Sequence, residues 1–184
     1  ANETWMSKVW DSSKSKKDKI LIEQLYPGTD DYVNHFNSIL PILKDDRYLK
    51  IDGSPVFVLY KPLEFDDCKA FIELWNDLAV KAGFKHGIHF VGYANYDYQV
   101  EPIIKLGFNS VNMVRLSEFF NYKKFRIKNI WSLFLNKYLK LPMIIHYSQA
   151  IKYFCDERDK NDMIYPTLLP NWDHTPRSGN RGLV

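Results

Sequence analysis

Pro55-Val-Phe-Val-Leu-Tyr60 is an almost continuous apolar run of strand length, and a repeating pattern extends from it in both directions. Asp52-Gly53, directly before it, has the chemistry of a turn. Residues 66–83 after it have helical apolar periodicity, with Asp66 or Asp67 as the cap and Gly83 as the stop. Ile88–Tyr93 is the next apolar strand. Such strands are typical of parallel sheets covered by helices, so this stretch predicts a strand–helix–strand unit.

Toward the amino terminus, residues 19–24 predict a short extended segment. A helix is predicted over residues 30–43, because its apolar positions follow three- and four-residue spacing. Thr29 or Asp30 is expected to cap this helix, and Pro41 to kink or shorten its last turn.

Toward the carboxyl terminus, a short helix is predicted over residues 98–106 and a third strand over residues 108–114. A fourth strand is predicted over residues 163–169, with Pro166 at a sheet edge or a bulge because proline cannot donate to the ladder. Strand and helix thus alternate through most of the chain, which predicts an α/β fold.

Residues 117–161 are too many for a simple connection between strands, so we expect a helical insertion there. Within it, residues 119–140 interleave aromatic side chains with lysine and arginine. Two interpretations stay open: an amphipathic helix pair packed on the domain, or weak contact with a membrane surface.

The composition excludes several classes of function. The chain has 184 residues, 46% of them hydrophobic, and a formal charge of only +3, so it predicts one globular domain without the concentrated basic face of a nucleic-acid-binding protein. Cys68 and Cys155 lie far apart and form no metal-ligand motif. They fit a reducing compartment, so we expect a cytoplasmic location, with peripheral inner-membrane contact as the alternative. Oligomeric state is not predicted.

The polar residues that could bind a ligand follow the predicted strands. Because the carboxyl ends of parallel strands meet on one face of an α/β domain, we expect these residues to be neighbours. Trp5 and Trp10 are added because they sit in polar neighbourhoods, where an aromatic ring suits the C–H faces of sugar rings, with core packing as the alternative. The predicted substrate-binding residues are Asn2, Trp5, Trp10, Tyr60, Asn95, Asp97, Trp172, His174 and Arg177.

Glu3 and Asp173 are the candidate catalytic residues. Reaction at a glycosidic bond needs one carboxyl group to protonate the leaving oxygen and often a second to activate or act as the nucleophile. Glu3 lies between Asn2 and Trp5, and Asp173 lies between Trp172 and His174. Capping or turn roles are the alternative for either acid. No metal site and no cofactor are predicted, since histidine spacing and Gly-rich phosphate loops are both lacking.

A set of motifs resembles the WbsX-type proteins of bacterial lipopolysaccharide O-antigen and capsule clusters, which are named glycosyltransferases and are similar to the barrel of glycoside hydrolase family 99. The resemblance extends over nearly the whole chain. The motifs are Ala1-Asn-Glu-Thr-Trp5, Trp10-Asp11, Leu21-Ile-Glu-Gln24, Arg47-Tyr48, Ile51-Asp-Gly-Ser-Pro-Val-Phe57 and Pro170-Asn-Trp-Asp-His-Thr-Pro-Arg177. Thr4 departs from the asparagine that the family often has there.

The resemblance implies a (β/α)8 TIM-barrel-like fold. The chain starts at Ala1 rather than Met, and we expect residues 1–184 to form a single, incomplete barrel domain lacking its first strands and its last. The implied function is making or breaking a glycosidic bond in bacterial surface polysaccharide, with an oligosaccharide or polysaccharide as substrate. The alternatives are an endo-acting family 99 type hydrolase and a non-catalytic glycan-binding protein.

Overall fold

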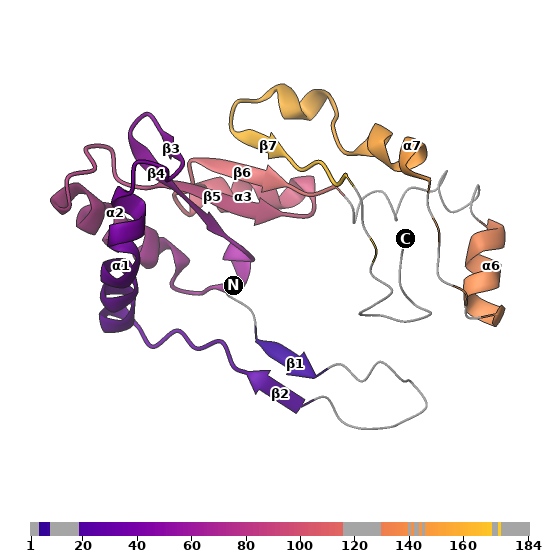
Figure 1. The fold of residues 1–184 in the computed structure, drawn as a ribbon, viewed down its shortest axis with the longest axis horizontal. Coiled ribbons are helices and arrows are strands. Elements are labelled where there is room, and N and C mark those ends of the chain that lie inside the picture. Colours follow the sequence, from indigo (N-terminus) through magenta and orange to yellow (C-terminus); the bar gives the residue numbers. More distant parts are fainter. Residues whose placement is uncertain are drawn as a thin grey trace.

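The computed structural model describes residues 4–7, 19–115, 130–139, 141, 144, 146–170 and 173 (Figure 1). The strands are β1 (Trp5–Ser7), β2 (Lys19–Ile22), β3 (Lys50–Ile51), β4 (Ser54–Leu59), β5 (His89–Ala94), β6 (Ser110–Met113) and β7 (Ile164–Pro166). The α-helices are α1 (Thr29–Lys44), α2 (Cys68–Lys81), α3 (Val100–Lys105), α6 (Ile130–Leu139) and α7 (Tyr147–Ala150). Short 3₁₀ helices are η1 (Pro62–Glu64), η2 (Asp97–Gln99), η3 (Ile151–Tyr153) and η4 (Glu157–Lys160).

The main sheet is curled, and its strand order is β3-β4-β5-β6-β7. Strands β4 to β7 are parallel to one another. They also pair in sequence order, β4 with β5, β5 with β6 and β6 with β7. This order has no reversal point, unlike that of a doubly wound sheet. The predicted α/β class with a parallel sheet is therefore confirmed, and the order agrees with part of a barrel. Closure into eight strands stays a prediction.

The sheet begins with a hairpin whose turn was predicted from the sequence and whose first strand was not. Asp52 and Gly53 both have positive φ, 50° and 79°, and they join β3 to β4 as an antiparallel pair. Positive φ at both central positions suits the twist of a two-residue hairpin turn, and glycine adopts it without steric cost. The turn was predicted, whereas the two-residue strand β3 was not.

Helix α1 begins one residue earlier than predicted and ends one later. The predicted cap is wrong: Gly28 occupies the N-cap position, no side chain caps the helix, and Thr29 is its first residue. Pro41 lies inside the helix, which continues to Lys44. Asp67 does precede α2 as predicted, but its side chain forms no capping hydrogen bond.

The core lies between the sheet and helices α1, α2 and α3. Trp75 of α2 is fully buried at its centre, and its indole Nε1 donates a 3.0 Å hydrogen bond to the carbonyl oxygen of Tyr32 in α1. The rings of Phe57, Phe71 and Phe90 surround it at 4.7, 4.4 and 6.4 Å between centroids. This aromatic cluster fixes the two helices against β4 and β5.

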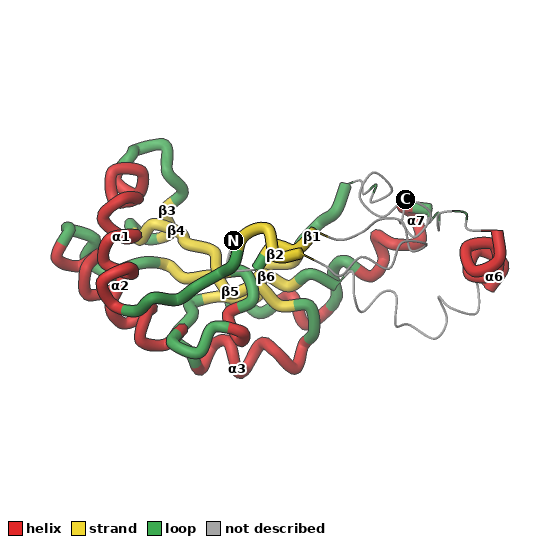
Figure 2. Tube along the Cα trace, turned by 90° about the horizontal axis from the view of Figure 1, so that it is seen from below, coloured by secondary structure: helices red, strands yellow, loops and turns green. Residues whose placement is uncertain are grey.

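Gly92 of β5 allows α3 to approach the sheet closely. A Cβ atom at this position would lie 2.4 Å from Cγ2 of Ile103 in α3 and 3.2 Å from the ring of Phe108. Figure 2 shows α3 below the strands, with the β1–β2 hairpin on the other side. In register with Gly92, Leu59 and Val111 are also buried on the helical side. The alternate residues of each strand therefore form the opposite face of the sheet.

The last strand and the insertion are confirmed in part. β7 is an edge strand of the described sheet, which accommodates Pro166 as predicted. Helices α6, α7, η3 and η4 lie between β6 and β7, in agreement with the helical insertion, while residues 116–129 are outside the described part. Among the helices that the structure describes, none has the length and apolar run required to span a bilayer.

Candidate functional site

The face of the sheet opposite the helices ends in polar and aromatic side chains at the carboxyl ends of the parallel strands. Tyr60 follows β4, Tyr93 and Asn95 lie at the end of β5, Asn112 is near the end of β6, and Thr167 follows β7. All five are half-buried. Carboxyl ends of parallel strands are where α/β domains assemble their ligand sites, so these residues form the candidate site.

Tyr60, Tyr93 and Asn95 form the aromatic part of this site. The rings of Tyr60 and Tyr93 meet edge to face at 4.8 Å, and the Tyr93 hydroxyl donates a 3.0 Å hydrogen bond to Oδ1 of Asn95. Burial, and then the neighbouring Tyr60, raise the pKa of Tyr93, although the hydrogen bond to Asn95 acts in the opposite direction. Tyr93 is therefore a neutral hydrogen-bond donor at physiological pH.

The loop after β5 is fixed by a side chain of η2. Oε1 of Gln99 accepts hydrogen bonds from the backbone N–H groups of Asn95, at 2.8 Å, and Tyr96, at 3.1 Å. On the neighbouring strands, Nδ2 of Asn112 donates to the carbonyl oxygen of Tyr165 and to Oγ1 of Thr167, at 3.1 and 2.8 Å. These bonds join β6 to β7 and preorganise the amide groups at the edge of the site.

Arg115, directly after β6, is the most buried charge of the site, with 2% of its side chain exposed. Its Nη1 lies 3.0 Å from Oδ1 of Asp97, and its Nη2 lies 2.5 Å from Oδ1 of Asp159 in η4. Arg158 also pairs with Asp97. A buried guanidinium needs such carboxylate partners, so Asp97, predicted to bind substrate, is here engaged in ion pairs. Its predicted contact with substrate stays a prediction.

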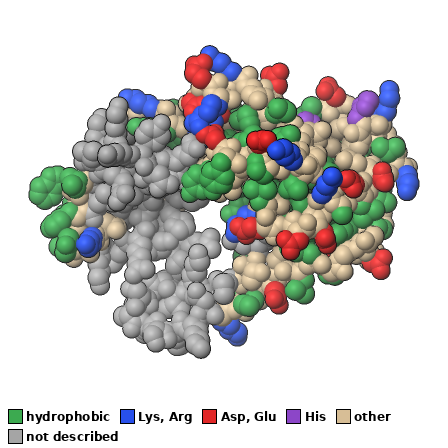
Figure 3. Space-filling model, turned by 180° about the vertical axis from the view of Figure 1, so that it is seen from behind, with side chains coloured by type: hydrophobic (Ala, Val, Ile, Leu, Met, Phe, Trp, Pro, Cys, Tyr) green, Lys and Arg blue, Asp and Glu red, His purple; other side chains and the backbone are tan. Residues whose placement is uncertain are grey.

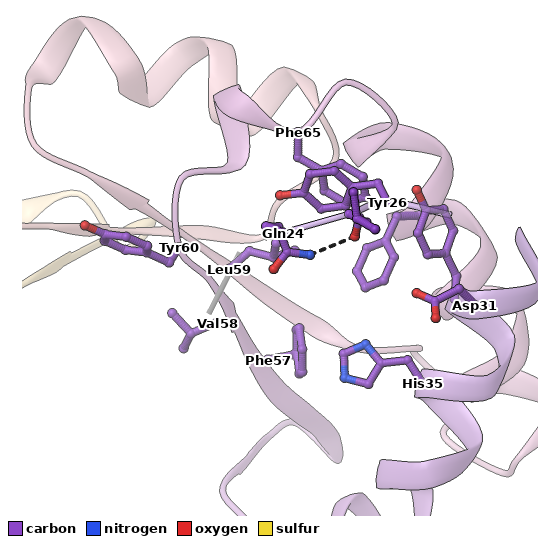
Figure 4. A pocket seen from close by; sticks show the side chains of 12 residues that line it. Gln24, Tyr26, Asp31, His35, Phe57, Val58, Leu59, Tyr60 and Phe65 are labelled. Atoms are coloured by element: carbon purple, nitrogen blue, oxygen red, sulfur yellow. Dashed lines mark hydrogen bonds between the residues drawn. The ribbon is translucent and has the colours of Figure 1, made fainter. Parts of the chain in front are cut away.

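A pocket of about 310 Å³ adjoins Tyr60 at the side of β4 (Figure 4). It is mainly aromatic, and its polar groups are Gln24, Asp31 and His35, the last two one turn apart on α1. The backbone N–H of Gln24 donates a 3.1 Å hydrogen bond to Oγ1 of Thr4. That bond joins Thr4 to a residue that lines the pocket. The lining residues are Gln24, Leu25, Tyr26, Asp31, Tyr32, His35, Phe57, Val58, Leu59, Tyr60, Phe65 and Phe71.

A second polar cluster occupies the same face at the opposite, amino-terminal ends of the strands. Nε2 of His89 lies 3.2 Å from Oγ of Ser110 and 3.2 Å from the hydroxyl of Tyr165. Burial lowers the pKa of His89, while the charge of Asp52 acts in the opposite direction. Groups at this end of a parallel sheet generally stabilise the fold, so we assign this cluster a structural role.

The structure brings together three of the residues predicted from sequence: Tyr60, Asn95 and Asp97. Trp5 lies on β1, which pairs with β2, and 58% of it is exposed. Asp173 is exposed. The remaining predictions lie outside the described residues, so the separation of the candidate catalytic pair stays untested. They are Asn2, Glu3, Trp10, Trp172, His174 and Arg177.

Tyr93, Asn112 and Arg115 lie in strand-end segments that the sequence predicts on this face, although they were not among the predicted substrate-binding residues, and Asp159 was not predicted in this region at all. A signal was present for the first three, because they lie in or directly after apolar strands. Asp159 comes from η4, which no strand pattern announces. In the part of the chain that the structure describes, no group of three or more His, Cys, Asp or Glu side chains could hold a metal ion.

The comparison with protein families gives a match to the glycosyltransferase WbsX model over residues 1–184, the whole chain. The chain belongs to the WbsX glycosyltransferase family. Comparisons with curated proteins and with solved structures gave no significant match. As a WbsX protein it is a carbohydrate-active enzyme of polysaccharide biosynthesis that acts on glycosidic bonds, and its substrate is a carbohydrate. The strand ends combine an aromatic surface with hydrogen-bonding groups, two features that suit a carbohydrate ligand.

Proposed function

We propose that this WbsX protein forms a glycosidic bond in the assembly of a bacterial surface polysaccharide, O-antigen or capsule. The observation that supports this most is the cluster of Tyr60, Tyr93 and Asn95 at the carboxyl ends of β4 and β5. Sugar C–H faces pack on aromatic rings, and sugar hydroxyls pair with amide and hydroxyl groups. A site with both kinds of group side by side suits a carbohydrate better than a flat apolar ligand.

We propose further that this sheet is part of a (β/α)8 barrel. The sequential strand order and the helices on one face support closure, because both are features of a barrel and not of a doubly wound sheet. In a closed barrel the strand ends form a ring. Thr4 contacts Gln24, which lines the same pocket as Tyr60, and this contact supports a place for the amino-terminal motif near the ring in the proposed barrel.

In the proposed reaction, Glu3 and Asp173 act on opposite sides of the glycosyl carbon. One carboxyl group donates its proton to the leaving oxygen as the bond between that oxygen and the anomeric carbon breaks. The other, as a carboxylate, accepts the proton of the acceptor hydroxyl as its oxygen forms the new bond to the same carbon. After the reaction the two carboxyl groups together have the same charge as before. The group that was protonated is now a carboxylate, and the former carboxylate is protonated.

The test is a comparison of Glu3→Gln and Asp173→Asn with the exposed acids of α2, Glu73→Gln and Asp77→Asn. Each site variant should lower sugar transfer to isolated polysaccharide acceptor by at least about 100-fold, because general acid–base catalysis is worth that much. The α2 variants should retain wild-type rates. Transfer that persists in both site variants would remove this pair from the mechanism.

A hydrolase of the family 99 type is the second candidate. It is favoured by the sequential strand order together with the lack of a Gly-rich phosphate loop, since nucleotide-sugar enzymes generally use doubly wound folds. Incubation with nucleotide sugars and, separately, with isolated O-antigen shows which is consumed. Carboxyl oxygens about 5–5.5 Å apart would predict retention of configuration, and about 6.5–9.5 Å inversion.

A glycan-binding protein without catalysis is the remaining alternative from the sequence. It predicts that no substrate turns over, that Glu3→Gln and Asp173→Asn leave glycan binding unchanged, and that Trp172→Ala abolishes binding. Product analysis after incubation tests the first prediction, and isothermal titration with isolated polysaccharide measures the two binding effects.

A further inference from the structure

Positive charge is concentrated in one part of the chain. Residues 119–155 contain seven lysines and arginines and no aspartate or glutamate. Since the chain has 25 basic and 22 acidic residues, 18 basic residues remain elsewhere, and the rest of the chain has a formal charge of −4. The near-neutral total thus conceals a basic segment within an acidic protein, a distribution typical of proteins that meet an anionic surface.

Helix α6, Ile130–Leu139, lies within this basic segment and has an apolar face. By the 3.6-residue repeat, its six large apolar residues with described side chains fall on about half of the circumference. Ser132, Asn136 and Lys137 fall on the other half, and only Leu133 breaks the division. The six residues, called here the α6 face, are Ile130, Trp131, Phe134, Leu135, Tyr138 and Leu139.

The α6 face is exposed. Trp131 has 74% of its surface exposed, Tyr138 61% and Leu139 61%. Among the residues that the structure describes, the rings of these aromatic side chains contact one another along the helix, Trp131 with Phe134 at 6.0 Å and Phe134 with Tyr138 at 4.6 Å. Figure 1 shows α6 standing well away from the sheet, and Figure 3 shows hydrophobic side chains at the outer margin of the molecule where α6 lies.

Lys137 places a positive charge beside this face. Its Nζ lies 5.3 Å from the centroid of the Tyr138 ring. At a bilayer surface, an ammonium group beside an aromatic ring can remain among the lipid headgroups while the ring reaches the acyl boundary. Tryptophan and tyrosine are the side chains enriched at this depth.

We propose that α6 docks this protein on the surface of a bilayer that contains anionic lipids. Two independent observations support the assignment: the α6 face is exposed and apolar, and the segment around it has charge complementary to anionic headgroups. The helix has ten residues, too short to span a bilayer, so it lies in the plane of the interface. This docking does not depend on which glycosidic reaction the protein performs.

The test measures co-sedimentation of the purified protein with vesicles of phosphatidylcholine, with and without 30 mol% (about one lipid in three) phosphatidylglycerol. The protein should sediment with the anionic vesicles and, by at least about tenfold, less with the neutral ones. Trp131→Ser combined with Phe134→Ser should abolish sedimentation, and Lys137→Glu should weaken it by about tenfold. The matched controls are Leu49→Ser combined with Val80→Ser, both exposed apolar residues elsewhere, and Lys69→Glu on α2.

Circular dichroism spectra and urea midpoints equal to wild type establish that the variants are folded. Equal sedimentation with both kinds of vesicle, or no sedimentation with either, overturns the proposal. The proposal is also overturned if the Leu49/Val80 control loses as much vesicle sedimentation as the Trp131/Phe134 variant. Light scattering without lipid provides a further check. If the wild type is a dimer that dissociates in the Trp131/Phe134 variant, a second copy of the chain covers the α6 face, and the docking proposal is overturned.

Discussion

Nη2 of Arg115 lies 2.5 Å from Oδ1 of Asp159, although 44 residues separate them in the sequence. The guanidinium also binds Asp97, so one buried side chain joins the loop after β5, the end of β6 and η4. Arg115→Ala should lower the free energy of unfolding by about 3 kcal/mol, because it leaves the partner carboxylates uncompensated. Urea denaturation measures this. Arg47→Ala, which breaks an ion pair with Asp45 at an exposed position, is the control and should lower the urea midpoint far less.

The close approach of α3 to β5 predicts that Gly92→Ala destabilises the protein by about 1–3 kcal/mol, the usual effect of overpacking. The new methyl group would collide with Ile103, whose own position is fixed at a helix–sheet contact. A double-mutant cycle with Ile103→Ala tests the cause. If the collision is responsible, Gly92→Ala costs much less in the Ile103→Ala background; additive effects would refute this explanation.

The two cysteines should differ sharply in reactivity. Cys68 is fully buried in the core, and burial raises the pKa of its thiol to about 11, so it is protonated at pH 8. Cys155 is exposed. Iodoacetamide at pH 8 should add one group to the folded protein and two after unfolding, as read by mass spectrometry. Cys155→Ser should remove the fast modification. Equal rates at both positions in the folded protein would contradict the buried placement of Cys68.

Asp45 predicts a pH dependence at acid pH. Its carboxylate accepts hydrogen bonds from the side chain and the backbone N–H of Arg47, which lower its pKa from 3.8 to about 2. A folded-state pKa below the unfolded value stabilises the fold above about pH 4, and this stabilisation is lost as the pH falls toward 2. NMR titration of the carboxyl carbon should show an upward shift in Arg47→Ala, and a smaller one in Lys50→Ala, whose charge contributes least.

The stacking surface at the strand ends predicts the effect of Tyr60 on glycan affinity. Tyr60→Ala removes the ring that meets Tyr93 edge to face, so affinity for isolated polysaccharide should fall by about tenfold, the order expected for one aromatic contact. Isothermal titration in the absence of lipid measures it. Tyr138→Ala, which removes an exposed tyrosine on α6, away from the strand ends, should bind the polysaccharide as wild type does. Equal losses would mean that the strand ends are not the sugar site.

Periodic segments were predictable from the sequence because local apolar spacing determines them. The strand at 55–60, the helix around Trp75 and the strand at 88–93 agree with the structure to within about two residues, and Pro166 lies on an edge strand as predicted. The cap of α1 was predicted wrongly. Backbone geometry at Gly28, with φ of 104°, overrides the preference of threonine and aspartate for that position.

The site was predictable only where it follows a strand. Tyr60 and Asn95 were predicted because each follows an apolar run that forms a parallel strand. The carboxyl end of such a strand lies at the edge of the sheet where ligands bind, so position alone identified them. The partnership of Arg115 with Asp159 depends on how a distant 3₁₀ helix returns to the sheet. Sequence spacing contains no information on such a contact, so Asp97 could be recognised as a member of the region but not as an ion-pair partner.

The sequential strand order also bears on how the polypeptide folds during its synthesis. β4 pairs with β5 and β5 with β6, so each strand emerges from the ribosome when its neighbour has already been made. Pairing between nearby segments closes short loops and favours rapid folding. β7 differs, because Val111 of β6 pairs with Ile164 only after the entire segment that contains α6 has been translated. We expect β7 to join last, so ribosomes stalled before Ile164 should display a nascent chain with β4–β6 protected from protease and the edge of β6 still unpaired.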